Sequence, residues 1–200
     1  PILVIAFILL STSLAAGKGR VYSKFIHRDG NSTLPGLFRL EVNHAKAKAK
    51  QVVVVFTADW CSPCKALKSF LDESPTGQNK AIGGHFLFID VDEWRRPAHR
   101  LIPTINPRKL PTIVRVDYEG KAVRTCFGTD LGLLSEESTG KNLARLIKGK
   151  APKRPEYETN PELRRELIVR QTVRRKARAK GVKPVTVEVV GPPRGKGPVK

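Results

Sequence analysis

Residues 51–64 read QVVVVFTADWCSPC, and this stretch decides the fold. The run from Gln51 to Thr57 is apolar and largely β-branched, which is typical of a strand buried on both faces. Cys61 and Cys64 follow with a two-residue spacing, and Pro63 between them suits the first turn of a helix, where its missing N–H costs nothing. The sequence therefore predicts a buried strand that leads directly into a helix beginning at a cysteine pair.

That placement gives the cysteine pair a chemistry. Unpaired backbone N–H groups and the helix dipole stabilise a thiolate at a helix N-terminus. A thiolate is the nucleophile of thiol–disulfide exchange, and a second thiol in the next turn can resolve the mixed disulfide. Such a pair can attack a substrate disulfide and then release the product.

Three other interpretations of the pair remain open. In the first, the pair is half of a zinc site, for which Cys126 and the scattered His27, His44, His85 and His99 would have to supply the other ligands. In the second, the pair is an inert structural disulfide, although so small a ring adds little loop-closure stabilisation. In the third, it is a remnant without redox activity. The sequence favours redox chemistry, because the chain lacks a second cysteine pair.

The remaining patterns predict an α/β fold. Helical segments are expected at Leu37–Lys50, Ala66–Leu71 and Ser138–Ile147, and a second buried strand at His85–Val91. A turn at Tyr118–Lys121 joins two strands in an antiparallel hairpin, Thr112–Val116 and Ala122–Phe127. This order implies a small mixed sheet with helices on both sides.

Composition limits the function classes. The 200 residues suffice for one domain with extensions, and three cysteines cannot make a disulfide-stapled scaffold. An aromatic content of 6% argues against a base-stacking RNA-binding sheet. The formal net charge of +19, from 37 Lys and Arg against 18 Asp and Glu, should attract anionic partners.

Much of this charge lies in residues 151–200, which carry 14 Lys and Arg and 5 Glu, a net of +9. We predict a basic, partly disordered tail, with a helix at Pro161–Lys180 and a strand-like patch at Val185–Val190.

The first residues predict export. Ile2–Leu10 is continuously apolar, and Ser13-Leu14-Ala15 fits the small-x-small rule of a cleavage site. We expect residues 1–16 to be a signal peptide, truncated at its N-terminus, and residues 17–50 to form a lead-in and an N-terminal helix. The protein is then secreted or periplasmic. The alternative is an uncleaved membrane anchor, but this apolar run falls short of the roughly 20 residues that span a bilayer.

The stretch Phe56–Lys65 (FTADWCSPCK), with Leu110-Pro111-Thr112 downstream, resembles the thioredoxin superfamily. It is especially similar to the thioredoxin-like domains of periplasmic thiol:disulfide interchange proteins. The resemblance implies a thioredoxin-like domain at residues 51–150, with a central mixed sheet of four or five strands between layers of helices.

The resemblance also implies roles for individual residues. Cys61 is expected to be the attacking thiolate and Cys64 the resolving thiol, and Trp60 an aromatic wall beside them. Leu110 and a cis Pro111 would pair with the extended backbone of a substrate. No metal and no cofactor are expected beyond the redox-active Cys61–Cys64 disulfide. The partners would be protein disulfides and an unidentified dithiol electron donor.

The chain departs from this family in three places. Val55 and Phe86 occupy the positions where many thioredoxins carry a buried Asp and a Lys, so the resolving thiol lacks their proton acceptor. Residues 92–109 are longer and more basic than usual, and form either a site for an acidic or bulky partner or a solvated loop. Cys126 is expected to be buried and unreactive.

Two functions remain open from the sequence. The first is a thiol:disulfide oxidoreductase, with reduction favoured over oxidation because Ser62-Pro63 is close to the Gly-Pro of reducing family members. The second is a non-catalytic adaptor with the same fold. In either case the basic tail is a candidate tether to an anionic surface, which would be lipid, polymer or nucleic acid.

Overall fold

A computed structural model of the chain describes residues 21–179. They divide into two units, of which the first ends at Pro155 and the second begins at Glu156. The predicted signal peptide at residues 1–16 and the predicted patch Val185–Val190 lie outside the described residues. Within residues 21–179, no helix combines the length and the apolar character needed to cross a bilayer.

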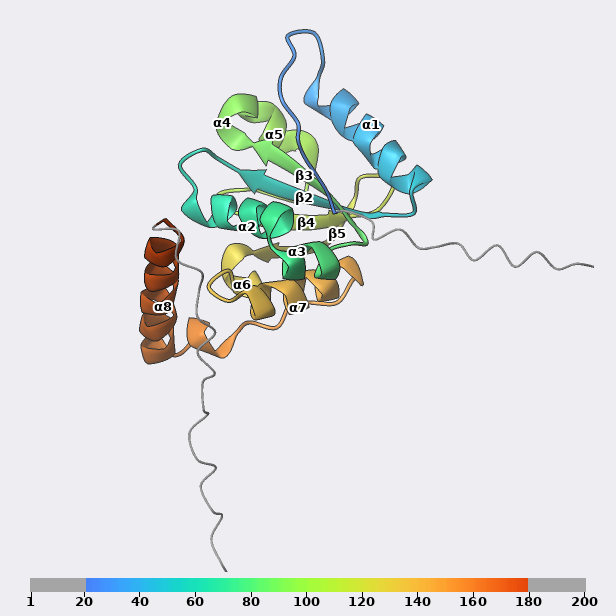
Figure 1. Ribbon diagram of the computed structural model, residues 1–200. Helices are drawn as coiled ribbons and strands as arrows, with labels where there is room; N and C mark the ends of the chain where they lie inside the picture. Colours follow the sequence, from blue (N-terminus) through green and yellow to red (C-terminus); the bar gives the residue numbers. More distant parts are fainter. Residues whose placement is uncertain (1–20, 180–200) are drawn as a thin grey trace, which may run out of the picture. The chain divides into compact units, whose positions relative to one another are not determined.

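The first unit is built on a mixed five-stranded sheet of order β1-β3-β2-β4-β5 (Figure 1). Strands β1, β3 and β2 run parallel, whereas β4 is antiparallel to β2 and β5 is antiparallel to β4. The strands are β1 (Tyr22–Phe25), β2 (Gln51–Thr57), β3 (Gly84–Asp90), β4 (Thr112–Val116) and β5 (Ala122–Phe127).

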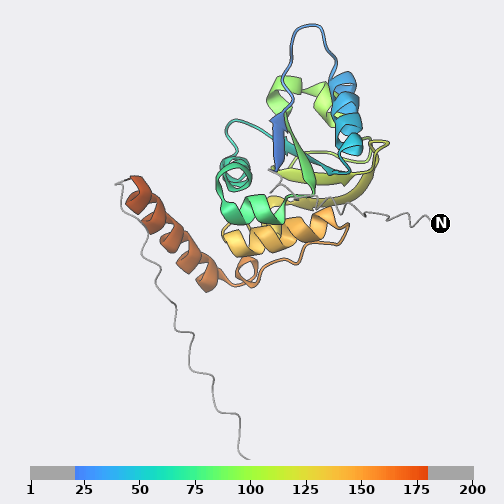
Figure 2. The ribbon, with the colours of Figure 1, turned by 45° about the vertical axis from the view of Figure 1, so that its right-hand side comes forward.

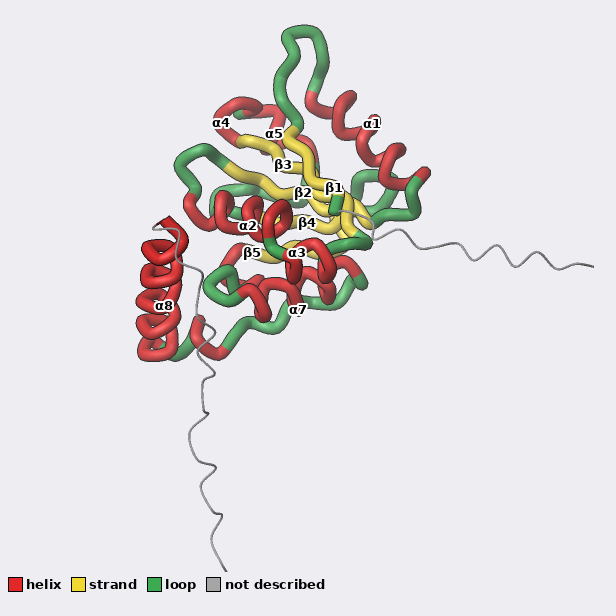
Figure 3. The backbone as a smooth tube through the Cα atoms, in the orientation of Figure 1, coloured by secondary structure: helices red, strands yellow, loops and turns green. Residues whose placement is uncertain are grey.

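Helices cover both faces of this sheet (Figures 2 and 3). One face carries α1 (Leu34–Ala47), α4 (Val91–Trp94) and α5 (Arg96–Leu101). The other carries α2 (Ser62–Glu73), α3 (Pro75–Lys80), α6 (Gly128–Leu131) and α7 (Glu136–Ile147).

The central strand β2 shows why this arrangement is stable. Its alternate residues Val52, Val54 and Phe56 belong to the core beneath α1, while Val53 and Val55 belong to the core beneath α2 and α7. All five side chains are fully buried. The continuous apolar run is therefore explained by a strand with a hydrophobic layer on each side.

Side-chain caps define the starts of the three longest helices of this unit, α1, α2 and α7. Thr33 caps α1 by accepting the N–H of Gly36, and Ser135 caps α7 by accepting the N–H of Ser138. These hydroxyls satisfy N–H groups that have no partner within the helix. At α2 the capping residue is Cys61 itself.

The structure confirms the predicted sheet and corrects two segments. Residues 17–35 were expected to be a lead-in, but they contain β1, which pairs in parallel with β3 at the sheet edge. The solvated-loop interpretation of residues 92–109 is wrong for its first half, which contains most of α4 and all of α5. Trp94, Ala98 and Ile102 hold these short helices against the core.

The second unit contains a short 3₁₀ turn, Glu156–Glu158, and the helix α8 (Pro161–Ala179). The side chain of Asn160 accepts the N–H of Glu162 at 3.0 Å at the start of α8. The predicted helix at Pro161–Lys180 is confirmed as far as Ala179. Its apolar residues Ile168, Val169 and Val173 are exposed.

Candidate active site

The two cysteines of the motif form a disulfide at the start of α2, directly after β2. Their Cα atoms lie 5.3 Å apart. Cys61 is the N-cap residue of α2, and its Sγ accepts the backbone N–H of Cys64 at 3.2 Å. This N–H remains available to a thiolate at Cys61 when the pair is reduced. The predicted geometry of a sulfur at a helix N-terminus is therefore present.

Both cysteines are almost inaccessible in the disulfide form, at 3% exposed for Cys61 and 2% for Cys64. They form a small apolar cluster with Ala58, against which Val91 and Leu110 pack. A substrate disulfide must reach sulfur through this thin apolar rim, so the residues around it control access.

Trp60 is the large exposed residue of this rim, with 70% of its surface accessible. Its indole N–H donates to Asp92 Oδ2 at 2.8 Å. Asp92 is itself placed by Asp90, which accepts the N–H groups of Asp92 and Glu93 as the cap of α4. The end of residues 92–109 next to Trp60 is therefore acidic, in contrast to the basic character expected for that segment.

The segment Leu110–Pro111 faces the disulfide from the start of β4. The peptide bond between the two residues is cis, as the family resemblance implied, and Leu110 packs on the cysteine cluster. Among residues 21–179 the backbone N–H and C=O of Leu110 make no hydrogen bond. They are thus available to the backbone of an extended peptide.

Gly128 supports Pro111 from the end of β5. Its N–H donates to the carbonyl of Pro111 at 3.1 Å. A Cβ atom at Gly128 would lie 2.9 Å from Pro111 Cδ and 3.1 Å from Leu133 Cδ1, so the contact requires glycine. Sequence reasoning missed this residue, because the contact joins residues 17 positions apart around a hairpin.

Cys64 also borders a solvent-accessible pocket of about 330 Å³ on the side of α2. Charged residues that line the pocket include Asp59, Lys68, Asp72 and Glu73. Lys68 pairs with Asp72, and Ser69 donates to Glu73, whereas Asp59 is exposed. Cys64, the expected resolving cysteine, thus lies beside a polar pocket that the sequence did not indicate.

Val55 and Phe86, the two positions that depart from the family, are surrounded by apolar side chains. Val55 and Phe86 are fully buried in the apolar cluster beneath α2 and α7. Neither can accept or stabilise a proton from Cys64. Charged groups instead line the pocket that Cys64 borders.

The third cysteine is free and buried in β5. Burial, with a smaller contribution from Asp130, raises the pKa of Cys126 to about 12. The predicted burial is confirmed. The zinc interpretation of the cysteine pair is not supported within residues 21–179, where no group of metal-ligating side chains includes Cys61 or Cys64.

Comparison with known proteins agrees with this geometry. A family model described as a thioredoxin-like domain matches residues 38–128. Thioredoxin 1 of Plasmodium falciparum is 31% identical over 85 residues, which are 42% of this chain and 74% of that protein. The chain belongs to the thioredoxin family.

Two further proteins are similar to part of the chain. The thiol:disulfide interchange protein DsbD of Pectobacterium atrosepticum is 33% identical over 84 residues, which are 42% of this chain and 15% of DsbD. The chain thus covers a small part of the DsbD relatives that it matches. A disulphide isomerase structure from Xylella fastidiosa Temecula1 aligns with a TM-score of 0.49 and 22% identity, over 60% of this chain and 95% of the other.

Proposed function

We propose that this thioredoxin-family protein is a thiol:disulfide oxidoreductase that reduces disulfides in protein substrates. The observation that carries the proposal is the position of Cys61, whose Sγ caps α2 and accepts the Cys64 N–H. A negative charge on that sulfur is stabilised by the hydrogen bond and by the helix dipole.

The reaction begins with the reduced pair. The Cys61 thiolate attacks one sulfur of a substrate disulfide, a Cys61–substrate bond forms, and the other substrate sulfur leaves as a thiolate. Cys64 then loses its proton and attacks Cys61 Sγ. The second substrate sulfur is released, and the product is the Cys61–Cys64 disulfide seen in the structure.

Trp60, Leu110 and Pro111 would bind and position the substrate. The substrate chain would lie extended against the segment before β4 and pair with the backbone N–H and C=O of Leu110. The exposed indole of Trp60, held by Asp92, would cover the opposite side of the reacting sulfurs. A separate dithiol donor then returns the disulfide to the reduced pair.

Reduction of insulin disulfides in the presence of dithiothreitol tests the assignment. We expect Cys61→Ser to abolish the catalysed rate, and Cys126→Ser, the matched control, to leave it unchanged. An intact protein that does not accelerate insulin reduction would favour the adaptor function. The reduction potential of the Cys61–Cys64 pair tests the direction, because a value near about −270 mV suits a reductant and one near about −120 mV an oxidant.

We place the activity outside the cytoplasm. The proposal is supported by the apolar run Ile2–Leu10 and by the similarity to DsbD proteins. Fractionation of cells that express the full precursor, with detection of the chain in the extracytoplasmic fraction, tests it. Recovery in the cytosol alone would reject this location.

The second candidate, an adaptor tethered to an anionic surface, is favoured by one feature. The basic side chains of α8 whose exposure the structure describes, Arg164, Arg165, Arg170 and Lys176, are exposed, and they lie within a region of net charge +9 at residues 151–200. Binding of this kind falls steeply with salt, because each neutralised anion releases counterions. Deletion of residues 156–200 should remove retention on heparin at moderate salt. Unchanged retention would reject the tether.

A further inference from the structure

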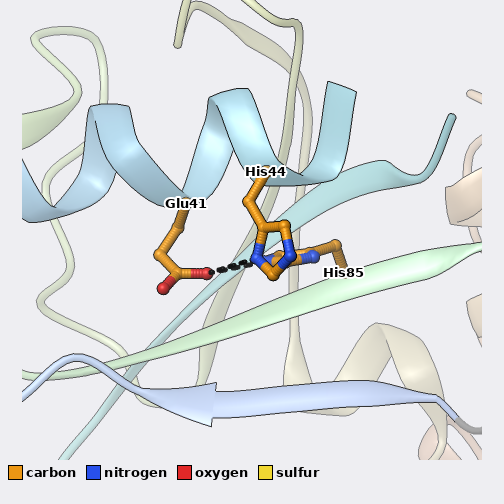
Figure 4. Close-up of side chains that lie close together, drawn as sticks. All are labelled: Glu41, His44 and His85. Atoms are coloured by element: carbon orange, nitrogen blue, oxygen red, sulfur yellow. Dashed lines mark hydrogen bonds and ion pairs between the residues drawn. The ribbon is translucent and has the colours of Figure 1, made fainter. Parts of the chain in front are cut away.

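A second group of chemically active side chains lies at the other end of the sheet from the disulfide. His85 is the second residue of β3 and pairs with Val52 near the start of β2, whereas Cys61 follows the end of β2. Glu41 and His44 project toward His85 from α1 (Figure 4). The proposed redox reaction uses none of the three.

The three side chains bring their donor atoms to one point. Glu41 Oε2 lies 3.0 Å from His85 Nε2 and 3.8 Å from His44 Nδ1, and all three atoms lie within 4.8 Å of one another. Ligand atoms of a tetrahedral Zn²⁺ site, each about 2.0–2.2 Å from the ion, are roughly 3.4 Å apart. The three atoms therefore need only small displacements to surround an ion.

The chemistry of the donors is that of a transition-metal site. One carboxylate and two imidazoles form a ligand set used by zinc enzymes and by non-haem iron proteins. Glu41 and His44 are three positions apart on one helix, the Glu-x-x-His spacing that places both ligands of one metal on the same helix face. His85 adds a ligand from a different element, so the set is fixed by the fold.

Burial and hydrogen bonds act on the two buried members of this group. Burial lowers the pKa of His85 despite its hydrogen bond to Glu41. Burial opposes ionisation of Glu41, but hydrogen bonds from Lys24 and His85 outweigh it and lower the pKa of Glu41.

Neighbouring side chains orient the carboxylate of Glu41. Lys24 Nζ donates to Glu41 Oε1 at 2.6 Å, while both histidines face the other oxygen, Oε2. The Tyr22 ring stacks on the His85 ring with centroids 4.0 Å apart, and its hydroxyl donates to Oε2 at 3.3 Å. Supporting contacts of this kind fix metal ligands in many sites.

We propose that Glu41, His44 and His85 bind one divalent transition-metal ion of the Zn²⁺ class. The side chain of His44 is 42% exposed, so an ion has an entry path there and water completes its coordination. Nδ1 of His85 has no hydrogen-bond partner within residues 21–179, so the metal-free form carries its proton on Nε2 and donates it to Glu41. Metal binding at Nε2 moves that proton to Nδ1.

The move of this proton affects the expected affinity for the metal. The hydrogen bond from His85 Nε2 to Glu41 is lost, and Nδ1 becomes a buried N–H without a described acceptor, which weakens metal binding. We therefore expect an affinity below that of a structural zinc finger. The ion would join α1 to the sheet and stabilise the fold, while disulfide exchange at the opposite end of the sheet proceeds without it.

Zn²⁺ titration of the full chain against a chromophoric chelator tests the proposal. The Cys61–Cys64 disulfide is kept oxidised, so that no thiolate pair competes. We expect one Zn²⁺ per chain. His44→Ala, whose side chain is half exposed and whose loss should not prevent folding, should weaken binding by about 100-fold or more, since even a supporting residue commonly contributes 10–100-fold.

His99→Ala is the matched control, because His99 is an exposed histidine of α5 and should leave the affinity unchanged. Cobalt substitution gives an independent signature, namely visible d–d bands without a thiolate charge-transfer band. Absence of stoichiometric binding by the unmodified chain would overturn the proposal. So would equal affinity of the unmodified chain and His44→Ala, or a thiolate band in the cobalt spectrum.

Discussion

The α2 start and strand β5 present the same residue type in nearly equal burial, yet with different chemistry. Cys61, Cys64 and Cys126 are each 2–3% exposed. At α2, the sulfur of Cys61 receives a backbone N–H and lies at the positive end of a 12-residue helix. In β5, Cys126 lies among apolar side chains and near Asp130, and its pKa rises to about 12. At nearly equal exposure, the backbone N–H at the start of α2 favours a thiolate at Cys61, whereas burial among apolar side chains, with a smaller contribution from Asp130, disfavours a thiolate at Cys126.

Alkylation of the reduced protein at mildly acidic pH tests this contrast with the largest expected effect. A thiol of pKa about 12 is about 10⁻⁵ thiolate at pH 7 and less below it. Cys61 should therefore react at least about 10³-fold faster than Cys126. Mass spectrometry of peptides after timed iodoacetamide treatment measures both rates. Equal labelling of the three cysteines in the folded protein would end the assignment of Cys61 as nucleophile.

Val55→Asp sharpens the comparison by giving the resolving cysteine the buried base it lacks. A general base matched to the operating pH commonly contributes a factor of about 10² or more. We expect faster turnover near neutral pH and less mixed disulfide trapped by acid quenching, together with a loss of stability from the buried carboxylate.

Val53→Asp is the matched control for that change. Val53 is equally buried on the same face of β2, two residues farther from the cysteines. It should destabilise the protein without accelerating turnover. A folded Val55→Asp protein with unchanged turnover and unchanged trapping would show that the proton of Cys64 leaves by another route.

Gly128→Ala tests whether the cis-proline segment Leu110–Pro111 depends on its close contact with Gly128. The new Cβ would lie 2.9 Å from Pro111 Cδ, so Pro111 or Leu133 must shift. We expect a loss of about 1–3 kcal/mol in the free energy of unfolding and a higher KM for insulin. Gly83→Ala, whose Cβ would meet Ile147 at an ordinary 3.4 Å, should change neither quantity much. Similar effects at both positions would contradict a specific role for Gly128.

Asp59→Asn carries the smallest expected effect. Asp59 lines the pocket beside Cys64 and is the candidate to accept its proton through water. Turnover near neutral pH should fall several-fold, with more mixed disulfide trapped. Asp72→Asn, in the same pocket but paired with Lys68, serves as control. If the two variants behave alike, the pocket carries no proton from Cys64.

The sequence predicted those elements whose information is local. The apolar run Gln51–Thr57 marks β2 residue for residue, and the turn before Ala122 marks the hairpin of β4 and β5. The α2 start was visible because Pro63 and the cysteine spacing act within one turn. The resemblance supplied the cis bond at Pro111, which no local pattern dictates.

Other features depend on contacts between distant residues, and the sequence did not reveal them. Strand β1 has four residues, including Ser23 and Lys24, so it lacks any strand pattern of its own. Helices α4 and α5 are too short to be stable alone and depend on the burial of Trp94 and Ala98. The Trp60–Asp92 hydrogen bond likewise joins residues 32 positions apart.

The place of β1 at the sheet edge has a consequence for the order of folding. Tyr22 pairs with His85, 63 positions later, so β1 has no partner until β3 exists. The β4–β5 hairpin closes over few residues and pays a much smaller loop entropy. We therefore expect β1 to dock late and to open first in the native protein. In amide hydrogen exchange, the β1 amides should lose protection by local opening, while those of β2 exchange only on global unfolding.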